Sequence, residues 1–286
     1  MNGILNINKP KGITSAAVVS KVKKILNTKT VGHMGTLDPQ GEGVLLLGIG
    51  KGTKLFDYLL KKDKIYEANF TFSYETDTLD GDGKIIKSCE KIPTLEELNA
   101  KIPLLIGKQQ QLPPNYSAKS IDGIRAYKLA REGKEITLKT AEVEIFNMKI
   151  IQSNPPVYKF LIHCSSGTYI RSICRDMAYS CNSLATMTSI TRLKSGNYLI
   201  DDSITLKELE IKKDAAIQNL EQALSSLKRF DLPLEYKKQI DNGMTISLSA
   251  FNYPPDSDFL LYCNNILYGI ASISDKYFKL KTYLKN

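Results

Sequence analysis

The sequence predicts a mixed α/β protein with a largely antiparallel central sheet and flanking helices, followed by a small β-rich domain. Three observations indicate this class. Apolar residues recur at helical spacing near the N-terminus, residues 66–74 alternate with the period of a strand, and short apolar runs separated by turn residues fill the last part. A chain of 286 residues can form one large and one small domain. We expect domains at 1–228 and 229–286.

The first expected elements are a strand and a helix. Residues 4–7 read as a short strand that ends at a turn containing Pro10 and Gly12. Thr14 or Ser15 can cap the following helix. One face of that helix carries apolar side chains at helical spacing, namely Val18, Val19, Val22, Ile25 and Leu26.

Residues 31–55, VGHMGTLDPQGEGVLLLGIGKGTKL, place one carboxylate in a glycine-rich loop before an apolar run that predicts a buried strand. Pro39 disfavours helical geometry at Asp38, so this carboxylate is expected on an extended or turning segment that can project it into a cleft. Two interpretations fit these residues. Asp38 is a nucleophile, or it caps a turn by bonding its own backbone, as Asp often does in such loops.

Residues 66–74 predict a half-buried antiparallel strand. Its apolar face consists of Tyr66, Ala68, Phe70, Phe72 and Tyr74. By this pattern alone, Tyr66 is a core tyrosine at the edge of the strand. The acidic segment 76–83 lacks the spacing of a calcium-binding loop and is expected to form a hairpin turn. Thr94 and Glu97 then form a capping box before a further helix.

Composition bears on partner and compartment. Lys and Arg number 39 against 30 Asp and Glu, a net charge of +9. This excess indicates nucleic acid or an anionic membrane surface as partner, unless the protein is merely soluble and basic. Scattered basic residues and the lack of a long apolar run favour nucleic acid. Five cysteines without a CxxC pair, two histidines and no signal-peptide pattern lead us to expect a cytoplasmic protein without a metal site.

Residues 106–133 are dense in basic and aromatic side chains, among them Lys119, Arg125 and Tyr116. That mixture suits an RNA surface, where cations meet phosphates and rings stack on unpaired bases, although a solvated face is the alternative. Strands are expected next at 137–151 and 157–164.

A helix is expected from about residue 170, capped by Ser166 or Thr168, with Ile170, Ile173, Cys174 and Met177 facing inward. Arg171 then stands in its first turn, where the helix dipole disfavours a cation. We therefore expect an anionic group to compensate this arginine.

Together these segments resemble the TruB-type tRNA pseudouridine-55 synthases. The shared motifs are NKPxGxTS at 8–15, GHMGTLDP at 32–39, KxY at 64–66, PPxYSA at 113–118, GxRAYxLAREG at 123–133 and GTYIR at 167–171. Residues 190–196 match LRRxxxG, with Ile190 for Leu and Thr191 for the first Arg. Met34 stands where the family commonly has Thr.

The resemblance implies the pseudouridine synthase fold, a PUA-like RNA-binding domain at 229–286, and a thumb-like insertion around 120–150 that grips the T loop of tRNA. It implies that Asp38 is the nucleophile, that Arg171 pairs with it, and that Tyr66 lies against the target base. The residues implied to bind substrate are His33, Tyr169, Ile190, Lys119 and Arg125.

The implied reaction isomerises uridine-55 to pseudouridine after the nucleotide is flipped out of the loop, and it needs no cofactor or metal. The implied partner is the T-arm stem-loop of tRNA, bound by a monomer without a protein partner. Two other classes stay open. An RNA chaperone without catalysis would not need Asp38 and Arg171, and a guide-RNA-dependent synthase in a multi-protein particle would not need the segment from PPxYSA to AREG.

Overall fold

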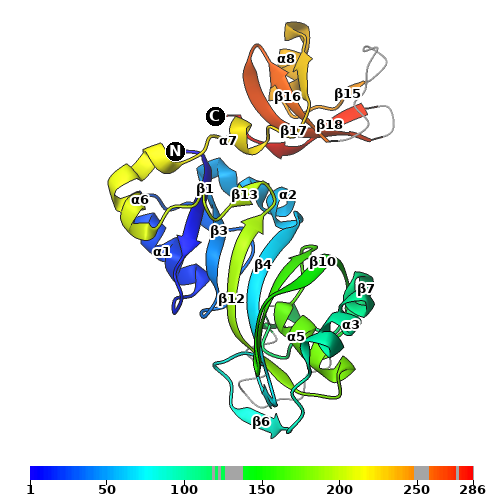
Figure 1. Cartoon of the computed structure of the whole chain (residues 1–286). Helices are drawn as coiled ribbons and strands as arrows, with labels where there is room; N and C mark the ends of the chain where they lie inside the picture. Colours follow the sequence, from blue (N-terminus) through cyan, green and yellow to red (C-terminus); the bar gives the residue numbers. More distant parts are fainter. Residues whose placement is uncertain (118–119, 122–123, 126–137, 248–257, 275–276, 286) are drawn as a thin grey trace.

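The computed structural model describes residues 1–117, 120–121, 124–125, 138–247, 258–274 and 277–285. Figure 1 shows a long curved sheet with helices along its flanks, and a small β domain above the edge that carries the N-terminus. Among these residues no helix is both long enough and apolar enough to cross a bilayer.

The central sheet has the strand order β1-β3-β12-β4-β11-β10-β7, with β2 beside β3 and β13 beside β12. Neighbouring strands are antiparallel, apart from the parallel pair β3 and β12. The strands are β1 (Gly3–Lys9), β2 (Val31–His33), β3 (Glu42–Ile49), β4 (Lys64–Phe72), β7 (Gly107–Gln111), β10 (Ala141–Asn154), β11 (Val157–Cys164), β12 (Ala185–Ser195) and β13 (Tyr198–Leu199).

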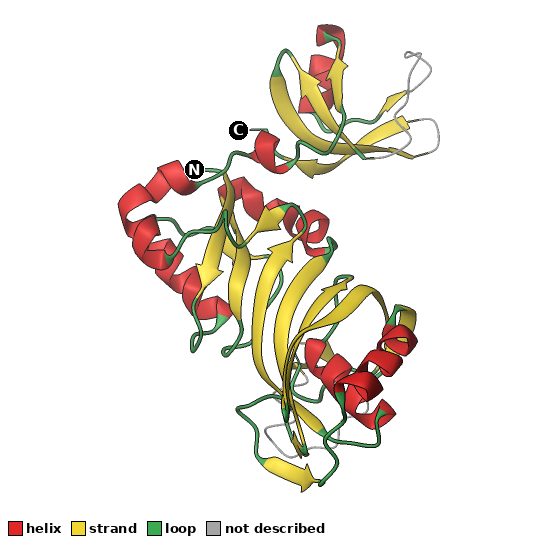
Figure 2. Ribbon diagram, viewed as in Figure 1, coloured by secondary structure: helices red, strands yellow, loops and turns green. Residues whose placement is uncertain are grey.

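Helices cover the flanks of this sheet, as Figure 2 shows. They are α1 (Ser15–Ile25), η1 (Gly50–Leu55), α2 (Phe56–Leu60), α3 (Leu95–Leu105), α5 (Ile170–Ser180), α6 (Leu206–Lys212), η2 (Lys213–Ala216) and α7 (Leu220–Ala223). Thr14 caps α1 by accepting a hydrogen bond from Ala17 N–H, and Thr94 and Glu97 form the predicted capping box of α3.

Two predicted local features differ in the structure. The alternating strand ends at Phe72 because Ser73 adopts a positive φ of 91°, so Tyr74 starts a separate short strand. Helix α5 is not capped by Ser166 or Thr168. Its N-cap is Tyr169, which makes no side-chain cap, while the Thr168 hydroxyl bonds the carbonyl of Ser165.

Two small hairpins lie outside the main sheet. β5 (Tyr74–Thr76) pairs with β6 (Ile85–Ser88) around the predicted acidic turn, and β8 (Ser120–Ile121) pairs with β9 (Ile124–Arg125). Within the range 120–150 expected for the thumb, residues 141–150 belong to β10 of the central sheet, and 122–123 and 126–137 lie outside the described residues.

The C-terminal residues form a five-stranded sheet of order β14-β16-β17-β18-β15. Its elements are β14 (Arg229–Leu232), η3 (Leu234–Tyr236), α8 (Lys237–Asp241), β15 (Ile246–Ser247), β16 (Phe259–Cys263), β17 (Ile266–Ser274) and β18 (Tyr277–Tyr283). One face of this sheet packs on the first domain. The buried cluster that joins the domains, here called the junction cluster, contains Ile4, Met34, Val44, Leu46, Leu55, Leu59, Leu220, Leu224, Leu260, Tyr262, Ile270 and Leu284.

The predicted fold class, a mixed α/β domain followed by a small β domain, is confirmed by this architecture. A second buried cluster joins α1, α3 and α5 to one face of the central sheet and supplies the core of the first domain. The loop after β2 and the start of α5 are thereby held on a rigid framework, which positions the side chains discussed next.

Candidate active site

Asp38 lies in the loop between β2 and β3, and the backbone of this loop is fixed from several sides. The Ser15 hydroxyl, at the start of α1, accepts a hydrogen bond from Leu37 N–H and lies 3.0 Å from the Leu37 carbonyl. The buried ammonium of Lys9 donates to the carbonyls of Pro39 and Gly41 at 3.1 and 2.5 Å. The loop carrying the carboxylate is therefore pre-organised by two neighbouring elements.

The carboxylate of Asp38 is directed away from its own turn. That turn is closed by a backbone bond from Gly41 N–H to the Asp38 carbonyl at 3.0 Å. The side-chain oxygen Oδ2 instead lies 3.0 Å from Nη2 of Arg171, with 41% of the Asp38 side chain exposed. This geometry favours the functional interpretation of Asp38 over the turn-capping one, because the carboxylate is partnered by a distant cation and is open to a ligand.

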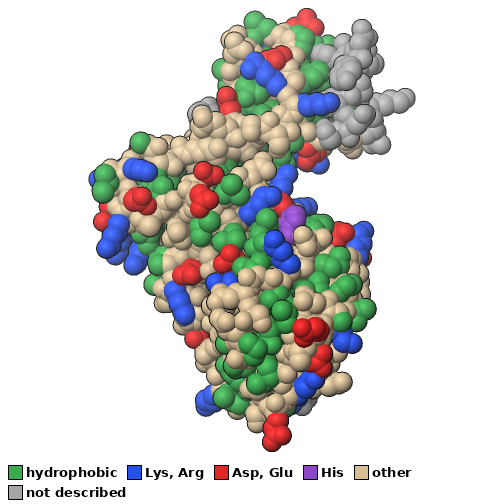
Figure 3. Space-filling model, viewed as in Figure 1, with side chains coloured by type: hydrophobic (Ala, Val, Ile, Leu, Met, Phe, Trp, Pro, Cys, Tyr) green, Lys and Arg blue, Asp and Glu red, His purple; other side chains and the backbone are tan. Residues whose placement is uncertain are grey.

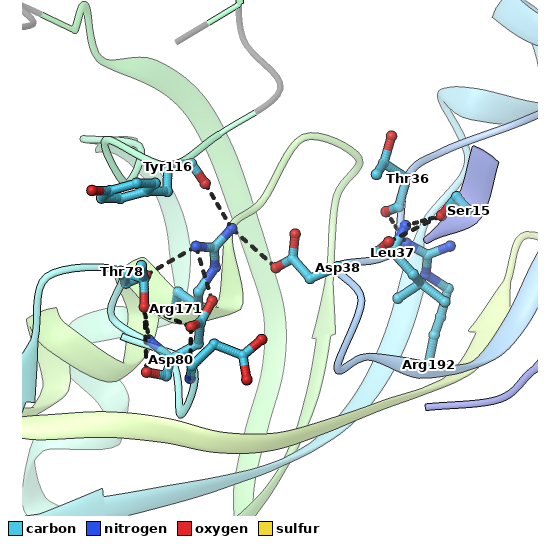
Figure 4. Close-up of polar contacts among 10 residues, drawn as sticks. Ser15, Thr36, Leu37, Asp38, Thr78, Asp80, Tyr116, Arg171 and Arg192 are labelled. Atoms are coloured by element: carbon cyan, nitrogen blue, oxygen red, sulfur yellow. Dashed lines mark hydrogen bonds and ion pairs between the residues drawn. The ribbon is translucent and has the colours of Figure 1, made fainter. Parts of the chain in front are cut away.

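Arg171, in the first turn of α5, is almost fully buried and divides its guanidinium between two carboxylates. Nη2 pairs with Asp38, and Nη1 lies 3.2 Å from Oδ2 of Asp80. The same two nitrogens donate to the carbonyls of Thr78 and Tyr116 at 2.9 and 3.0 Å (Figure 4). The expected anionic partner is thus present. The guanidinium does not pair with Asp38 through both Nη atoms, because Nη1 is held by Asp80 of the acidic turn.

Asp80 belongs to the turn between β5 and β6. Its Oδ1 accepts hydrogen bonds from the Thr78 hydroxyl at 2.6 Å and from Asp82 N–H at 3.2 Å, so its second oxygen is aimed at Arg171. Burial raises the pKa of the Asp80 carboxyl, and the hydrogen bond from Thr78 and the charge of Arg171 oppose that rise. The hairpin turn predicted from sequence therefore contributes directly to the site.

A cavity of about 360 Å³ opens beside Asp38 and falls in the size range of ligand pockets. Six of the predicted site residues line it, namely His33, Asp38, Tyr66, Tyr169, Arg171 and Ile190. The two predicted RNA contacts of the thumb are not placed with them. Lys119 lies outside the described residues, and Arg125 is described only as part of the backbone of β9.

Tyr66 and His33 give the cavity an aromatic wall in a buried setting. Burial raises the pKa of the Tyr66 phenol, which stays protonated at neutral pH. Burial, and then the charge of Arg192, lower the pKa of His33, so its imidazole is neutral there. Among the described residues, its buried Nδ1 has no hydrogen-bond partner. Both side chains are therefore uncharged where they face the cavity.

Tyr169 is held by its backbone. The side-chain amide of Gln111 accepts from Tyr169 N–H at 2.8 Å and donates to the Tyr169 carbonyl at 3.2 Å. This contact takes the place of the missing side-chain cap at the start of α5 and fixes the residue next to Arg171.

Sequence reasoning missed four charged residues of this site, namely Lys9, Lys64, Asp80 and Arg192. Lys64 and Arg192 line the cavity, and all except Asp80 are less than 5% exposed. A partial signal existed for each of them, since Lys9, Lys64 and Arg192 stand inside the motifs NKPxGxTS, KxY and LRRxxxG. Asp80 had only the cluster of acids around it, and its contact with Arg171 spans 91 positions of the chain.

The fold places the chain in a known structural class. Two solved structures, a Cbf5–Nop10–Gar1 complex and an H/ACA RNP bound to a substrate RNA containing 2′-deoxyuridine, contain chains that superpose with TM-scores of 0.74 and 0.72. They cover 98% and 99% of this chain and 84% and 85% of their own, at 20% and 19% identity, a level that shows a shared fold. The shared architecture is a mixed α/β domain followed by a small C-terminal β domain.

Sequence similarity defines the family. Residues 23–170 match the N-terminal domain of the TruB family pseudouridylate synthases. The tRNA pseudouridine synthase B of Clostridium novyi is 40% identical over 86% of both chains, that of Clostridium kluyveri 37% over 98% of both, and that of Thermosipho melanesiensis 38% over 95% of this chain and 91% of its own. The chain therefore belongs to the TruB family and is an enzyme of the isomerase class, as its motifs predicted.

Proposed function

We propose that this enzyme isomerises uridine-55 in the T loop of tRNA to pseudouridine, with Asp38 as the nucleophile. The observation that carries the proposal is the Asp38 carboxylate, held 3.0 Å from Arg171 at the wall of a cavity that Tyr66, Tyr169 and Ile190 also line. The similar proteins of Clostridium novyi and Clostridium kluyveri are tRNA pseudouridine synthases by name.

The reaction breaks the N1–C1′ bond of uridine, turns the uracil, and joins C5 to C1′. Because this is an isomerisation, it requires no cofactor or metal. Asp38 attacks as the carboxylate, and the Arg171 guanidinium favours that charged form and fixes its direction. The Tyr66 ring stacks on the base, and Tyr169 and Ile190 enclose it. These contacts offset the free-energy cost of flipping the nucleotide out of its stack, which is about a few kcal/mol.

Substrate recognition follows from charge and shape. Figure 3 shows Lys and Arg side chains gathered where the two domains meet on one face. Lys51 and Lys54 both lie 5.9 Å from the ring centre of Tyr283 at this junction. Cations beside an exposed ring suit a phosphate backbone with unpaired bases. We propose that His33, Lys119 and Arg125 hold the T loop and that the domain from Arg229 adds further RNA contacts.

We propose that the enzyme works in the cytoplasm as a monomer without a protein partner. The five cysteines are free, as expected in a reducing compartment. One structure of similar fold is an H/ACA RNP bound to RNA, but the relatives at 37–40% identity carry the name of a tRNA enzyme. That difference favours direct tRNA recognition over a guide-RNA particle, and the Asp38–Arg171 pair argues against a chaperone without catalysis.

Tritium release from C5-labelled uridine in unmodified tRNA tests the proposal. Wild type, Asp38→Asn and the matched surface variant Asp202→Asn are compared on the same tRNA and on one with the T-loop uridine replaced. We expect wild type and Asp202→Asn to release tritium and Asp38→Asn to release none. No protein should release tritium from the tRNA in which the T-loop uridine is replaced. Tight tRNA binding without release by the wild type would contradict the proposal and favour the chaperone or a missing partner.

A further inference from the structure

Arg192, on β12, is a buried cation at the back of the cavity, with 3% of its surface exposed. Its guanidinium donates to four oxygens. Nε donates to the Tyr66 hydroxyl at 3.2 Å, Nη2 to the Thr36 carbonyl at 2.8 Å, and Nη1 to the carbonyls of Val44 and Gly35 at 3.2 and 3.4 Å. Figure 4 shows Arg192 beneath the loop that carries Asp38.

These acceptors belong to three segments that the active site must hold together. Gly35 and Thr36 lie three and two residues before Asp38 in its loop. Val44 lies in β3 just after that loop, and Tyr66 lies in β4. Strand β12 runs between β3 and β4 in the sheet, so a side chain on it can reach both. One guanidinium therefore bonds both ends of the loop that carries Asp38 and also the hydroxyl of Tyr66, whose ring is proposed to face the base.

The backbone of Arg192 is locked to the same loop. It pairs with Gly43 at the start of β3, and Gly43 has a φ of +95° that favours glycine. A Cβ added to Gly43 would lie 2.3 Å from the Arg192 carbonyl oxygen. The close approach leaves no room for a side chain there, so both the main chain and the side chain of Arg192 define where the loop ends.

No carboxylate forms an ion pair with Arg192 within the part of the chain that the structure describes, and its charge is balanced by carbonyl and phenol dipoles. The charge is felt by other groups of the cavity. After burial, it is the main cause that lowers the pKa of His33, and it also lowers the pKa of Lys64. The His33 titration thus reports whether a positive charge is present at position 192.

We propose that Arg192 is a positioning residue of the reaction, which holds the Asp38 loop and the Tyr66 hydroxyl as one unit. The inference rests on the proposed roles of Asp38 and Tyr66. Lysine cannot replace it, because a single ammonium with three donors on a flexible stem cannot match a planar fork that engages four oxygens. Arg192 acts through these two groups, so its loss should affect turnover more than RNA binding.

The test compares Arg192→Lys, Arg192→Met and Lys194→Met with the wild type. Lys194 lies two residues along the same strand and pairs with Asp63, so Lys194→Met removes one positive charge from β12 without touching the loop. Single-turnover tritium release, tRNA dissociation constants and melting temperatures are measured for each. The imidazole protons of His33 are titrated by NMR in the wild type and in each variant.

Arg192→Lys is expected to turn over at least tenfold more slowly than wild type, with a tRNA dissociation constant within threefold and an unchanged His33 titration. Arg192→Met should be slower still, and the pKa of His33 should rise because a nearby positive charge is gone. Lys194→Met should match the wild type in turnover.

Three results would overturn the inference. These are wild-type turnover in either Arg192 variant, equal losses of binding and turnover, and failure of both variants to fold, which would make the residue purely structural. Absence of tritium release by the wild type would instead refute the proposed function, while the His33 titration would still report the positive charge at position 192.

Discussion

Replacing Arg171 by lysine is expected to reduce turnover severely while leaving tRNA binding largely intact. The arginine makes two ion pairs, with Asp38 and Asp80, and two hydrogen bonds, to the carbonyls of Thr78 and Tyr116. A lysine ammonium in the first turn of α5 keeps the charge. It loses the planar fork that reaches both carboxylates at once.

The size of the effect follows from the contacts that are lost. Hydrogen bonds to a charged group contribute about 1.5–3 kcal/mol each. If the loss of one or two such contacts is expressed in the orientation of Asp38 in the transition state, the barrier rises by about 2–4 kcal/mol, which corresponds to roughly a 30- to 1000-fold lower rate. The uncompensated carbonyls also lower the free energy of unfolding by about 1–3 kcal/mol.

Single-turnover tritium release with saturating enzyme measures this rate without a contribution from product release, and filter binding measures tRNA affinity separately. Arg175→Lys is the matched control. Arg175 lies one turn further along α5 and bonds its neighbour Asp176 and the carbonyl of Leu112. Its substitution should change turnover by less than threefold.

Turnover by Arg171→Lys within threefold of wild type would refute the argument from fork geometry. A loss of tRNA affinity as large as the loss of turnover would refute it as well, because the arginine would then act in docking. The melting temperatures of both variants, compared with the assay temperature, show whether a loss of activity results from unfolding instead.

Three further predictions concern charge. Asp80→Asn should slow turnover by roughly 10- to 100-fold, since one charge-assisted contact of Arg171 is lost, and equal rates for mutant and wild type in the tritium assay would contradict this. Burial lowers the pKa of Lys64 from 10.5 to about 8. Between these two pKa values the unfolded chain binds more protons than the folded one, so the free energy of unfolding should rise with pH. Urea titrations should show a rise of about 1–2 kcal/mol from pH 8 to 10 relative to Lys64→Met. The same pH dependence in both proteins would refute this prediction. Finally, tRNA affinity should fall by roughly 10- to 100-fold between about 50 and 200 mM salt, and a flat dependence in filter binding would argue against a basic docking face.

The sequence was sufficient for features that depend on local periodicity. The alternation from Tyr66 to Phe72 and the capping box at Thr94 each occupy a few consecutive residues, and both are present in the structure. The Arg171 partnership was expected for a similar reason, since a cation in the first turn of a helix requires an anion nearby.

What could not be predicted depends on residues brought together from distant positions. The division of Arg171 between Asp38 and Asp80 is set by how the β5–β6 turn folds back on α5. The cap of α5 failed as a prediction because Gln111, 58 positions away, bonds the backbone of Tyr169. Arg192 contacts three segments that are distant in the sequence, and no residue pattern within a single segment predicts these contacts.

The junction cluster has a consequence for how the protein unfolds. Met34, which is 1% exposed, lies in one apolar cluster with Leu260 and Leu284 of the C-terminal domain. A thioether suits such a site better than a hydroxyl, because it fills space without an unpaired polar group. Melting of the small domain would expose the underside of the loop that bears Asp38. We therefore expect the two domains to unfold as one cooperative unit, with a single transition in heat capacity and with activity lost together with the structure of the C-terminal domain.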